Sequence, residues 1–552
     1  MTAGPSGTLV IKGTVRQAFR DAARKYAGHD FLCVLPVTAQ KYAIEPQVWS
    51  YEQAEREVAR LETLYRASGL GHGHRVGLML ENRPAMFFHW LALNALGVSA
   101  VPINKEWRSA ELAYLIEHSE LCVAVVPPER AEAIAAAADQ AGRKVIVTAP
   151  DLSGLRELKV RAQFAERAPD GDTECALLYT SGTTGRPKGC VLTNEYFIWT
   201  GMWYASVGGF CTLRPGIERL ITPLPMTHMN AMAASTMGMM LSGGCIVPLD
   251  RFHPSTWWST VRESRATIVH YLGVMPAMLL GAESSARDRD HCVRFGFGAG
   301  VSPRLHAPFE SRFGFPLLEA WAMTETGSGA VIIASREPRK VGTSCFGRAD
   351  PRIEYRVVDE QGADVPRGTP GELLVRSAGA RPRFGFFREY LKDPEATATA
   401  WDGGYFHTGD IVQVDADGDF HFVDRKKNVI RRSGENISAV EVESVLGQHP
   451  GVAAVGVCAV PDTVRGDEVM ACIVPRTAVG ATNLGAFARD VVEFSLQRLA
   501  YFKAPGYVAL CEALPLTATE KIQRSQLKER AQVLLSSPAC VDTRALKKNS
   551  PH

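Results

Sequence analysis

Residues 179–189 read Tyr-Thr-Ser-Gly-Thr-Thr-Gly-Arg-Pro-Lys-Gly, and this stretch guides the interpretation of the whole chain. It follows the apolar run Ala176–Tyr179 and precedes the apolar pair Val191–Leu192, so we expect a loop between two strands. Seven of its eleven residues are Thr, Ser or Gly, and Lys188 lies near its end. Backbone N–H groups in such a turn can converge on phosphate oxygens, and hydroxyl groups add donors. The spacing is not that of a Walker A loop. Alone, the stretch predicts phosphate binding, and the alternative is a flexible surface turn.

The length and composition predict a multidomain globular protein. A chain of 552 residues exceeds what one hydrophobic core usually organises. Apolar residues make up 46% and charged residues 22%, close to the globular average. The formal net charge of +2 gives no overall field that would favour nucleic acid. The twelve cysteines include no Cys-x-x-Cys pair, so we interpret them as reduced thiols and expect a cytoplasmic location.

Two segments bear on membrane insertion. Met1–Gly13 has a single Lys and no apolar run of signal-peptide length, so we do not expect a signal peptide. The longest apolar stretch, Ala231–Leu249, is interrupted by three glycines and Pro248. We therefore predict a buried helix followed by a strand there, and no membrane span.

The hydrophobic pattern predicts an α/β fold with a change of character late in the chain. Helix and strand patterns alternate in the first third, as in a mainly parallel sheet covered on both faces. Later strands, such as Glu372–Arg376, predict a smaller β-rich subdomain near residues 340–423. We therefore predict a large N-terminal domain over residues 1–423, a boundary at 424–428 and a small α+β domain over 429–552. The polar tail from Ser536 to His552 is expected to be loose.

Five further segments follow the 179–189 loop in a fixed order. They are Pro225–Ala231, Trp321–Thr326, Tyr405–Asp410, Asp424–Ile430 with Ser433–Ile437, and Pro515–Arg524. In order and spacing the six segments resemble the motifs of the adenylate-forming superfamily, which comprises acyl-CoA and aryl-CoA synthetases, adenylation domains and luciferases. The resemblance extends from about Gly13 to about Arg530. Within the superfamily, Leu318–Glu325 and Thr519–Lys521 look most like the carnitine/crotonobetaine-CoA ligase branch of acyl-CoA ligases.

The resemblance implies an ATP-dependent acid–thiol ligase. A small-molecule carboxylic acid would attack the α-phosphorus of ATP, giving acyl-AMP and pyrophosphate, and coenzyme A would then take the acyl group. Because this chemistry brings two anions together, it needs fixed positive charge and dipoles where charge accumulates. Three alternatives stay open: transfer to a carrier-protein thiol or a partner enzyme, a luciferase-like oxygenase, and a nucleotide binder without catalysis. A homodimer is also possible.

Matched position by position, the resemblance implies a nucleotide site. Its phosphate loop would contain Thr180, Ser181, Gly182, Thr183, Thr184 and Lys188. Its adenine slot would be formed by Gly298, Ala299, Gly300, Glu319, Ala320 and Trp321, with the Trp321 ring on the base. The ribose would be bound by Asp410 and Arg425, and the α-phosphate by Thr324 and the catalytic Lys521. Glu325, together with Thr180, would hold Mg²⁺, which prefers oxygen ligands.

The remaining implied positions concern the thiol and the acyl group. In the family the small domain rotates between the two half-reactions, so Lys427 would be the hinge, and Ser433, Gly434 and Glu435 would line the coenzyme A tunnel. The acyl pocket would be lined by His228, Met229, Asn230, Ala322 and Gly327, with His228 as a gate and not a base. No acidic residue lies between Met226 and Leu249, which disfavours an α-amino acid. A short polar, an aromatic and a bulky alicyclic acid all remain open.

Overall fold

The computed structural model describes residues 2–3, 9–11, 13–155, 167–180, 186–359, 361–425, 430–433, 435–437, 439–480, 483–515, 522 and 524–548. The chain divides into two compact units. Unit 1 comprises Met1–Lys105, Ile116–Tyr179 and Gly189–Asp424, and unit 2 comprises Glu106–Leu115, Thr180–Lys188 and Arg425–His552. The domain boundary at 424–428 stays a prediction, since residues 426–428 lie outside the described part.

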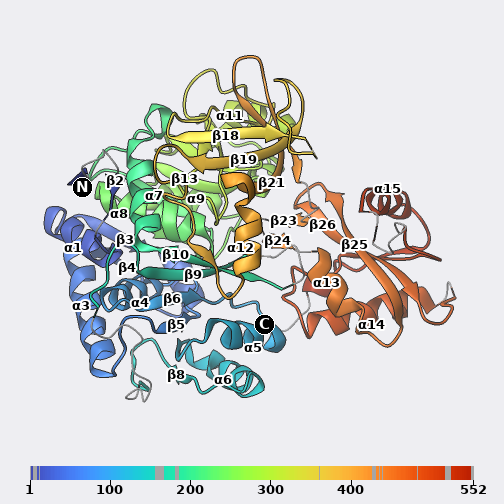
Figure 1. The fold of residues 1–552 in the computed structure, drawn as a ribbon, viewed down its shortest axis with the longest axis horizontal. Helices are drawn as coiled ribbons and strands as arrows, with labels where there is room; N and C mark the ends of the chain where they lie inside the picture. Colours follow the sequence, from blue (N-terminus) through green and yellow to red (C-terminus); the bar gives the residue numbers. More distant parts are fainter. Residues whose placement is uncertain are drawn as a thin grey trace. The chain divides into compact units, whose positions relative to one another are not determined.

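Two mainly parallel sheets organise the large part of the chain (Figure 1). The seven-stranded sheet has the order β20-β10-β9-β6-β5-β7-β8, and its strands β5 to β9 are joined by parallel pairs. The eight-stranded sheet has the order β16-β15-β14-β13-β11-β12-β3-β4, with antiparallel pairs only at its two edges. This arrangement confirms the predicted α/β class with layered parallel sheets. The strands are β3 (Asp30–Val34), β4 (Gln47–Ser50), β5 (Arg75–Leu78), β6 (Ser99–Pro102), β7 (Val123–Val125), β8 (Ile146–Thr148), β9 (Glu174–Thr180), β10 (Lys188–Thr193), β11 (Arg219–Thr222), β12 (Cys245–Pro248), β13 (Ile268–Leu272), β14 (Phe295–Ala299), β15 (Leu317–Trp321), β16 (Ile332–Ile333) and β20 (Glu389–Tyr390).

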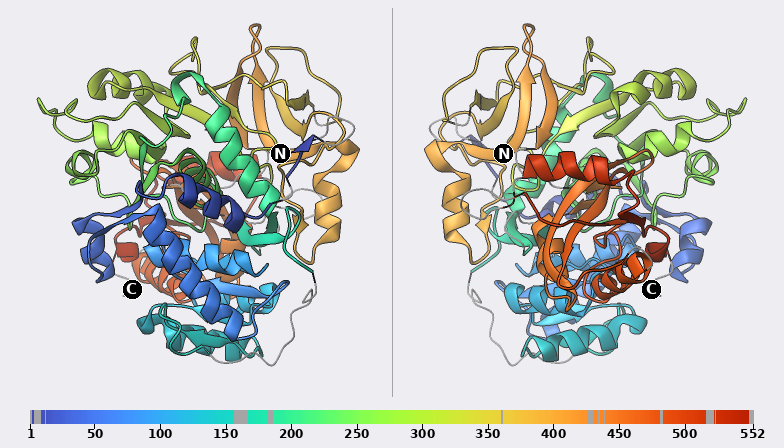
Figure 2. Two further views of the ribbon diagram at one scale, coloured as in Figure 1. Left: turned by 90° about the vertical axis from the view of Figure 1, so that its left-hand side faces the viewer. Right: turned by 90° about the vertical axis from the view of Figure 1, so that its right-hand side faces the viewer.

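Some of the helices between these strands begin at a side-chain cap, and α3 is one of them. Before α3, the Ser50 hydroxyl accepts from the Gln53 N–H at 3.1 Å, and the Gln53 side chain accepts from the Ser50 N–H at 2.8 Å. This is a complete capping box. Helix α4 is buried nearly all round, as its continuous apolar pattern predicts. Figure 2 shows α1, α3 and α4 packed on one another. The helices are α1 (Val15–Lys25), α2 (Pro36–Tyr42), α3 (Tyr51–Ala67), α4 (Pro84–Ala95), α5 (Ser109–Ser119), α6 (Ala131–Gln140), α7 (Asn194–Ser206), α8 (Thr236–Ser242), α9 (Trp257–Ser264), α10 (Val274–Leu280), α11 (Pro303–Phe313) and α12 (Pro394–Ala400).

A five-stranded antiparallel sheet forms the predicted small β subdomain of unit 1. Its strand order is β17-β22-β21-β19-β18. The strands are β17 (Cys345–Gly347), β18 (Ile353–Val358), β19 (Gly371–Ser377), β21 (Phe406–Val414) and β22 (Phe420–Arg425). Burial alternates strictly along β21, so every second residue of this strand is buried.

Unit 2 is an α+β unit in which β25 and β26 form a long hairpin. Its strands are β23 (Ile430–Arg432), β24 (Glu435–Ile437), β25 (Val452–Asp462), β26 (Gly466–Pro475), β27 (Tyr507–Leu510) and β28 (Cys540–Asp542), and its helices are α13 (Ala439–Leu446), α14 (Leu484–Leu496) and α15 (Arg524–Leu534). The expectation of a loose tail after Ser536 is wrong for the described residues. Strand β28 pairs with β27, and the buried Lys547 ammonium lies 2.8 Å from the Glu468 carboxylate. An ion pair and a strand pairing thus fix a segment whose polarity suggested disorder.

None of the described helices combines the length and the apolar character needed to cross a bilayer. The apolar stretch Ala231–Leu249 forms a buried helical segment and then β12, as predicted.

Candidate active site

The two predicted walls of the adenine slot lie on neighbouring parallel strands of unit 1. Strand β14 ends at Ala299 and β15 at Trp321, and Gly298 stands opposite Glu319. The carboxyl ends of parallel strands meet at one edge of a sheet, where α/β proteins place their ligands. Gly298 has to be glycine, because a Cβ there would lie 2.2 Å from the Tyr271 carbonyl oxygen. The segments 298–300 and 319–321, predicted separately, are therefore brought together.

The Glu319 carboxylate holds the loop that follows β14. Its oxygens accept from the backbone N–H groups of Gly300 at 2.9 Å and Val301 at 3.2 Å. The Tyr271 hydroxyl donates to the same carboxylate at 2.8 Å. Burial raises the pKa of the Glu319 carboxyl, although these three hydrogen bonds oppose the rise. Glu319 thus shapes the predicted slot through the backbone of its opposite wall.

Trp321 is connected to the predicted ribose-binding carboxylate. Its indole N–H donates to Oδ2 of Asp410 at 2.8 Å, and both residues are buried. Asp410 lies in β21, where its backbone N–H donates to the Thr408 hydroxyl at 3.0 Å. The sequence predicts only the stacking surface of Trp321, so this hydrogen bond is a new feature. It links the end of β15 to the β subdomain.

Thr324 and Glu325 follow β15 directly. The Tyr196 hydroxyl donates to the Thr324 carbonyl oxygen at 2.9 Å, and the Phe387 N–H donates to the Glu325 carbonyl oxygen at 2.8 Å. The buried Glu325 carboxylate accepts from the Tyr390 hydroxyl at 3.0 Å. A carboxylate is the ligand type that Mg²⁺ prefers. The Glu325 side chain therefore fits the predicted metal ligand.

The predicted acyl-pocket segment forms an unusual turn. His228 begins it, with its N–H donating to the Pro225 carbonyl oxygen at 3.0 Å, and a π-helix, η3, covers Asn230–Ser235. His270 of β13, a fully buried residue, contacts this turn. Its Nδ1 lies 2.7 Å from Oδ1 of Asn230. Burial lowers the pKa of the His270 imidazole to about 3, so the ring is neutral at physiological pH.

The other predicted acyl-pocket residues lie in different surroundings. Met229 is half-buried, and Ala322 is exposed. Gly327 packs so closely that a Cβ would lie 2.3 Å from the Tyr196 ring. Packing against α7 thus requires glycine at this position. The roles of these three residues in binding an acyl group stay predictions.

Unit 2 contains the described parts of the predicted phosphate loop and thiol tunnel. Thr180 is the last residue of β9, and Lys188 is the first of β10. Ser433 adopts φ 51° at the tight turn between β23 and β24, where Arg432 stands opposite Glu435. Outside the described residues lie Ser181, Gly182, Thr183, Thr184, Lys427, Gly434 and Lys521, and the Arg425 side chain is not described either.

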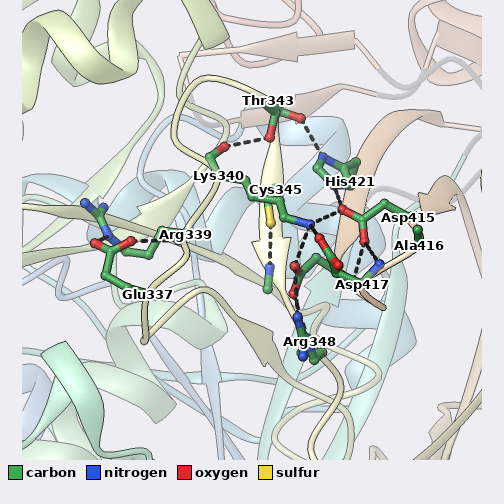
Figure 3. A network of polar contacts seen from close by, with 12 residues as sticks. Glu337, Arg339, Lys340, Thr343, Cys345, Arg348, Asp415, Ala416, Asp417 and His421 are labelled. Carbon is green, nitrogen blue, oxygen red and sulfur yellow. Dashed lines mark hydrogen bonds and ion pairs between the residues drawn. The ribbon is translucent and has the colours of Figure 1, made fainter.

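A cluster of carboxylates that the sequence analysis missed lies at the turn between β21 and β22. Asp415, Asp417 and Asp419 bring their oxygens close enough together to suit a metal ion. However, the Lys340 ammonium contacts all three, at 2.5, 2.7 and 2.8 Å (Figure 3). Arg348 adds an ion pair with Asp419 at 2.9 Å. These contacts raise the pKa of Lys340 and lower that of Asp415. A lysine ammonium thus occupies the position a cation would take.

Comparison with known proteins identifies the family. A profile of the family described as AMP-binding enzyme matches residues 19–391. The chain belongs to the AMP-binding enzyme family. The profile described as AMP-binding enzyme C-terminal domain matches residues 441–521 of this AMP-binding enzyme.

The similar proteins include enzymes named as CoA ligases and CoA synthetases. The crotonobetaine/carnitine–CoA ligase of Citrobacter koseri is 30% identical over 494 residues, covering 87% of this chain and 93% of the relative. The ATP-bound MatB structure from Rhodopseudomonas palustris is 26% identical with a TM-score of 0.64, and the match covers 94% of this chain and 99% of that one. The o-succinylbenzoate CoA synthetase of Bacillus subtilis, bound with a product analogue, has a TM-score of 0.79 at 23% identity, with 94% and 99% covered, and shows the shared fold.

These findings confirm the predicted family and activity. This AMP-binding enzyme is an AMP-forming acid–CoA ligase, which uses ATP and coenzyme A. The relatives do not favour transfer to a carrier protein or a partner enzyme. Neither His270 nor the Trp321–Asp410 hydrogen bond was predicted from the sequence. A histidine within the apolar run of β13 was the available signal, because a buried polar side chain requires a partner.

Proposed function

We propose that the carboxyl edge of β14 and β15 in this ligase binds ATP with the roles the sequence assigned. Gly298–Gly300 and Glu319–Trp321 hold the adenine, and Asp410 binds the ribose. One observation supports this proposal above the others: the indole N–H of Trp321 donates to Asp410 at 2.8 Å, joining the predicted adenine and ribose positions. The hydrogen bond engages one of the two carboxylate oxygens of Asp410, and a carboxylate can accept several hydrogen bonds.

The first half-reaction joins a carboxylate to the α-phosphorus of ATP. A carboxylate oxygen forms the new P–O bond, the bond to the β-phosphate oxygen breaks, and pyrophosphate leaves. Thr324 and Lys521 act as donors to the α-phosphate, where negative charge accumulates. Mg²⁺, when bound at Glu325 and Thr180, supplies positive charge that offsets the phosphate oxygens.

The second half-reaction transfers the acyl group to a thiol. The sulfur of coenzyme A attacks the acyl carbon, the C–O bond to AMP breaks, and the thiol proton is released. Ser433, Gly434 and Glu435 line the path of the thiol, after rotation about Lys427. A homodimer and a cytoplasmic location stay predictions.

Pyrophosphate release from ATP across a panel of carboxylic acids, with and without coenzyme A, tests the proposal. We expect acid-dependent release, acyl-CoA as the product, and a loss of about a hundred- to a thousandfold in rate for Lys521→Ala, because a preorganised charge donor is removed. Lys41→Ala, at an exposed position of α2, is the matched control and should keep full activity.

A protein that binds no ATP and releases no pyrophosphate with any acid would overturn the proposed function. An unchanged rate for Lys521→Ala would reject the assignment of that lysine while leaving the reaction standing.

A further inference from the structure

Two side-chain hydroxyl groups stabilise the wide turn of the π-helix η3. The Ser235 hydroxyl donates to the Asn230 carbonyl oxygen at 3.0 Å, and the Thr236 hydroxyl donates to the Ala231 carbonyl oxygen at 2.8 Å. Each bond spans five residues, which is the spacing of a π turn. Such turns are rare and occur frequently at functional sites. Asn230 is the first residue of this widened turn.

The hydrogen bonds of His270 fix which ring nitrogen carries the proton. Tyr204 is fully buried, and its hydroxyl bonds His270 Nε2 at 2.9 Å, its one partner among the described residues. A buried hydroxyl with one partner satisfies its hydrogen only by donating to it. Nε2 is therefore the acceptor, and the proton of the neutral ring lies on Nδ1.

The proton on Nδ1 determines the orientation of the Asn230 amide. Ser235 already donates its hydrogen to a carbonyl, so its oxygen can only accept from His270 Nδ1, at 2.8 Å. The Asn230 group that lies 2.7 Å from Nδ1 must likewise be an acceptor, because an amide NH₂ there would face another donor. Oδ1 of Asn230 thus points to His270, and the NH₂ group points away from it.

The NH₂ group of Asn230 has no acceptor in the part of the chain that the structure describes, and the residue is half-buried. One turn earlier, the Thr227 hydroxyl is also buried and lacks a hydrogen-bond partner among the described residues. Half-buried donors of this kind are satisfied by water or by a ligand. Two such groups in the predicted acyl segment indicate a polar ligand at this turn.

We propose that the Asn230 amide donates to a hydrogen-bond acceptor on the acyl group, so that the preferred acid carries a hydroxyl, keto or second carboxyl oxygen besides the reacting carboxylate. This inference rests on the proposed function, because it takes the acyl group to lie at the 227–236 turn. His270 acts as a positioning residue that fixes the amide. A plain alkyl acid leaves the donor unpaired, and sites built to bond a substrate oxygen discriminate against analogues that lack it.

Matched pairs of acids test this assignment. We would measure kcat/KM for butyrate against 3-hydroxybutyrate and 4-hydroxybutyrate, and for valerate against glutarate. The wild-type enzyme should favour the oxygenated member of at least one pair by about tenfold or more. Asn230→Leu should bring that ratio close to one, because it removes the donor that only the oxygenated acid can use. Ser235→Ala alters the same turn but keeps the amide, so the preference should survive.

Several outcomes would overturn the assignment. Equal use of both members of every pair by the wild type would do so. An equal loss for both members in Asn230→Leu would place the amide on the reacting carboxylate instead. If Asn230→Leu does not fold, Asn230→Asp keeps the shape and replaces the donor by an acceptor, and an intact preference there rejects the proposal. Calorimetry can measure how tightly each of these acids binds without any turnover. The role of the Asn230 donor is therefore tested even if the proposed ligase reaction fails.

Discussion

The two polar networks of unit 1 are built in opposite ways. Around His270 every partner is neutral and the ring is fully buried. Around Lys340 the groups are charged and lie at a surface turn (Figure 3). Burial accounts for the difference, because a buried charge is costly whereas a paired neutral group is not. The neutral network can fix the direction in which the Asn230 amide donates. The charged network stabilises the turn between β21 and β22, and its strength depends on salt concentration and pH.

Breaking the buried network should give the largest effect on stability. His270→Leu leaves the Tyr204 and Ser235 hydroxyls and the Asn230 amide without their shared partner. Since each unsatisfied buried group costs about 1–3 kcal/mol, we expect the free energy of unfolding to fall by about 2–4 kcal/mol. Urea unfolding of the full chain measures this loss.

The matched control is His253→Leu, whose ring bonds Asp250 at 2.9 Å and lies partly exposed. The free energy of unfolding of this variant should fall by less than about 1 kcal/mol, because water can replace the His253 ring as the partner of Asp250. Equal losses in the two variants would remove the distinction between buried and surface networks.

The two networks should also lose stability over different pH ranges, which is the second largest expected effect. The pKa of His270 falls from 6.5 in the unfolded chain to about 3 in the folded protein. Between these values the unfolded state binds the extra proton, so stability falls as pH falls, by up to about 1.4 kcal/mol per pH unit. The pKa of Asp415 is lowered from 3.8, so its contribution is present above 3.8 and is lost only as pH falls further.

Urea titrations at a series of pH values should therefore show a slope that begins near pH 6.5 in the wild type. In His270→Leu this part of the slope should become shallower but not vanish, because burial also lowers the pKa of His89 to about 4, and the decline below pH 3.8 should persist. A slope that is identical in both proteins would assign the titration to other groups.

The proposed adenine and ribose positions could be assigned from the sequence because their signal is local. Gly298, Glu319 and Asp410 each lie in a short motif, and the carboxyl edge of a parallel sheet is a general meeting place for such motifs. The order of the motifs then indicated the family. The sequence assigned these residues to one nucleotide site without any knowledge of the contacts between them, and the structure places Gly298 opposite Glu319.

The positioning groups could not be predicted, because they depend on contacts distant in sequence. His270 meets Asn230 across 40 positions, and Trp321 meets Asp410 across 89. Nothing local distinguishes the η3 turn from an ordinary helix, since the Ser235 and Thr236 hydroxyls select it only in the folded chain. The Asp415–Asp419 turn likewise resembles a cation site until Lys340, 75 positions earlier, is placed among the carboxylates.

Removing the lysine charge from the partly exposed Lys340 network should give the smallest effect and the strongest dependence on salt. Lys340→Met leaves three carboxylates whose oxygens lie within 4.8 Å of one another, and their repulsion should lower the melting temperature slightly at low salt. Salt screens such exposed charges over about 10 Å at 0.1 M, so the melting temperature of this variant should recover as salt is added, whereas that of His270→Leu should not. Lys392→Met, which removes a single ion pair with Glu120 at 3.1 Å, is the matched control and should show less recovery. A salt-independent loss for Lys340→Met would mean that its side chain acts through packing, and the contrast between the two networks would then lie in burial alone and not in charge.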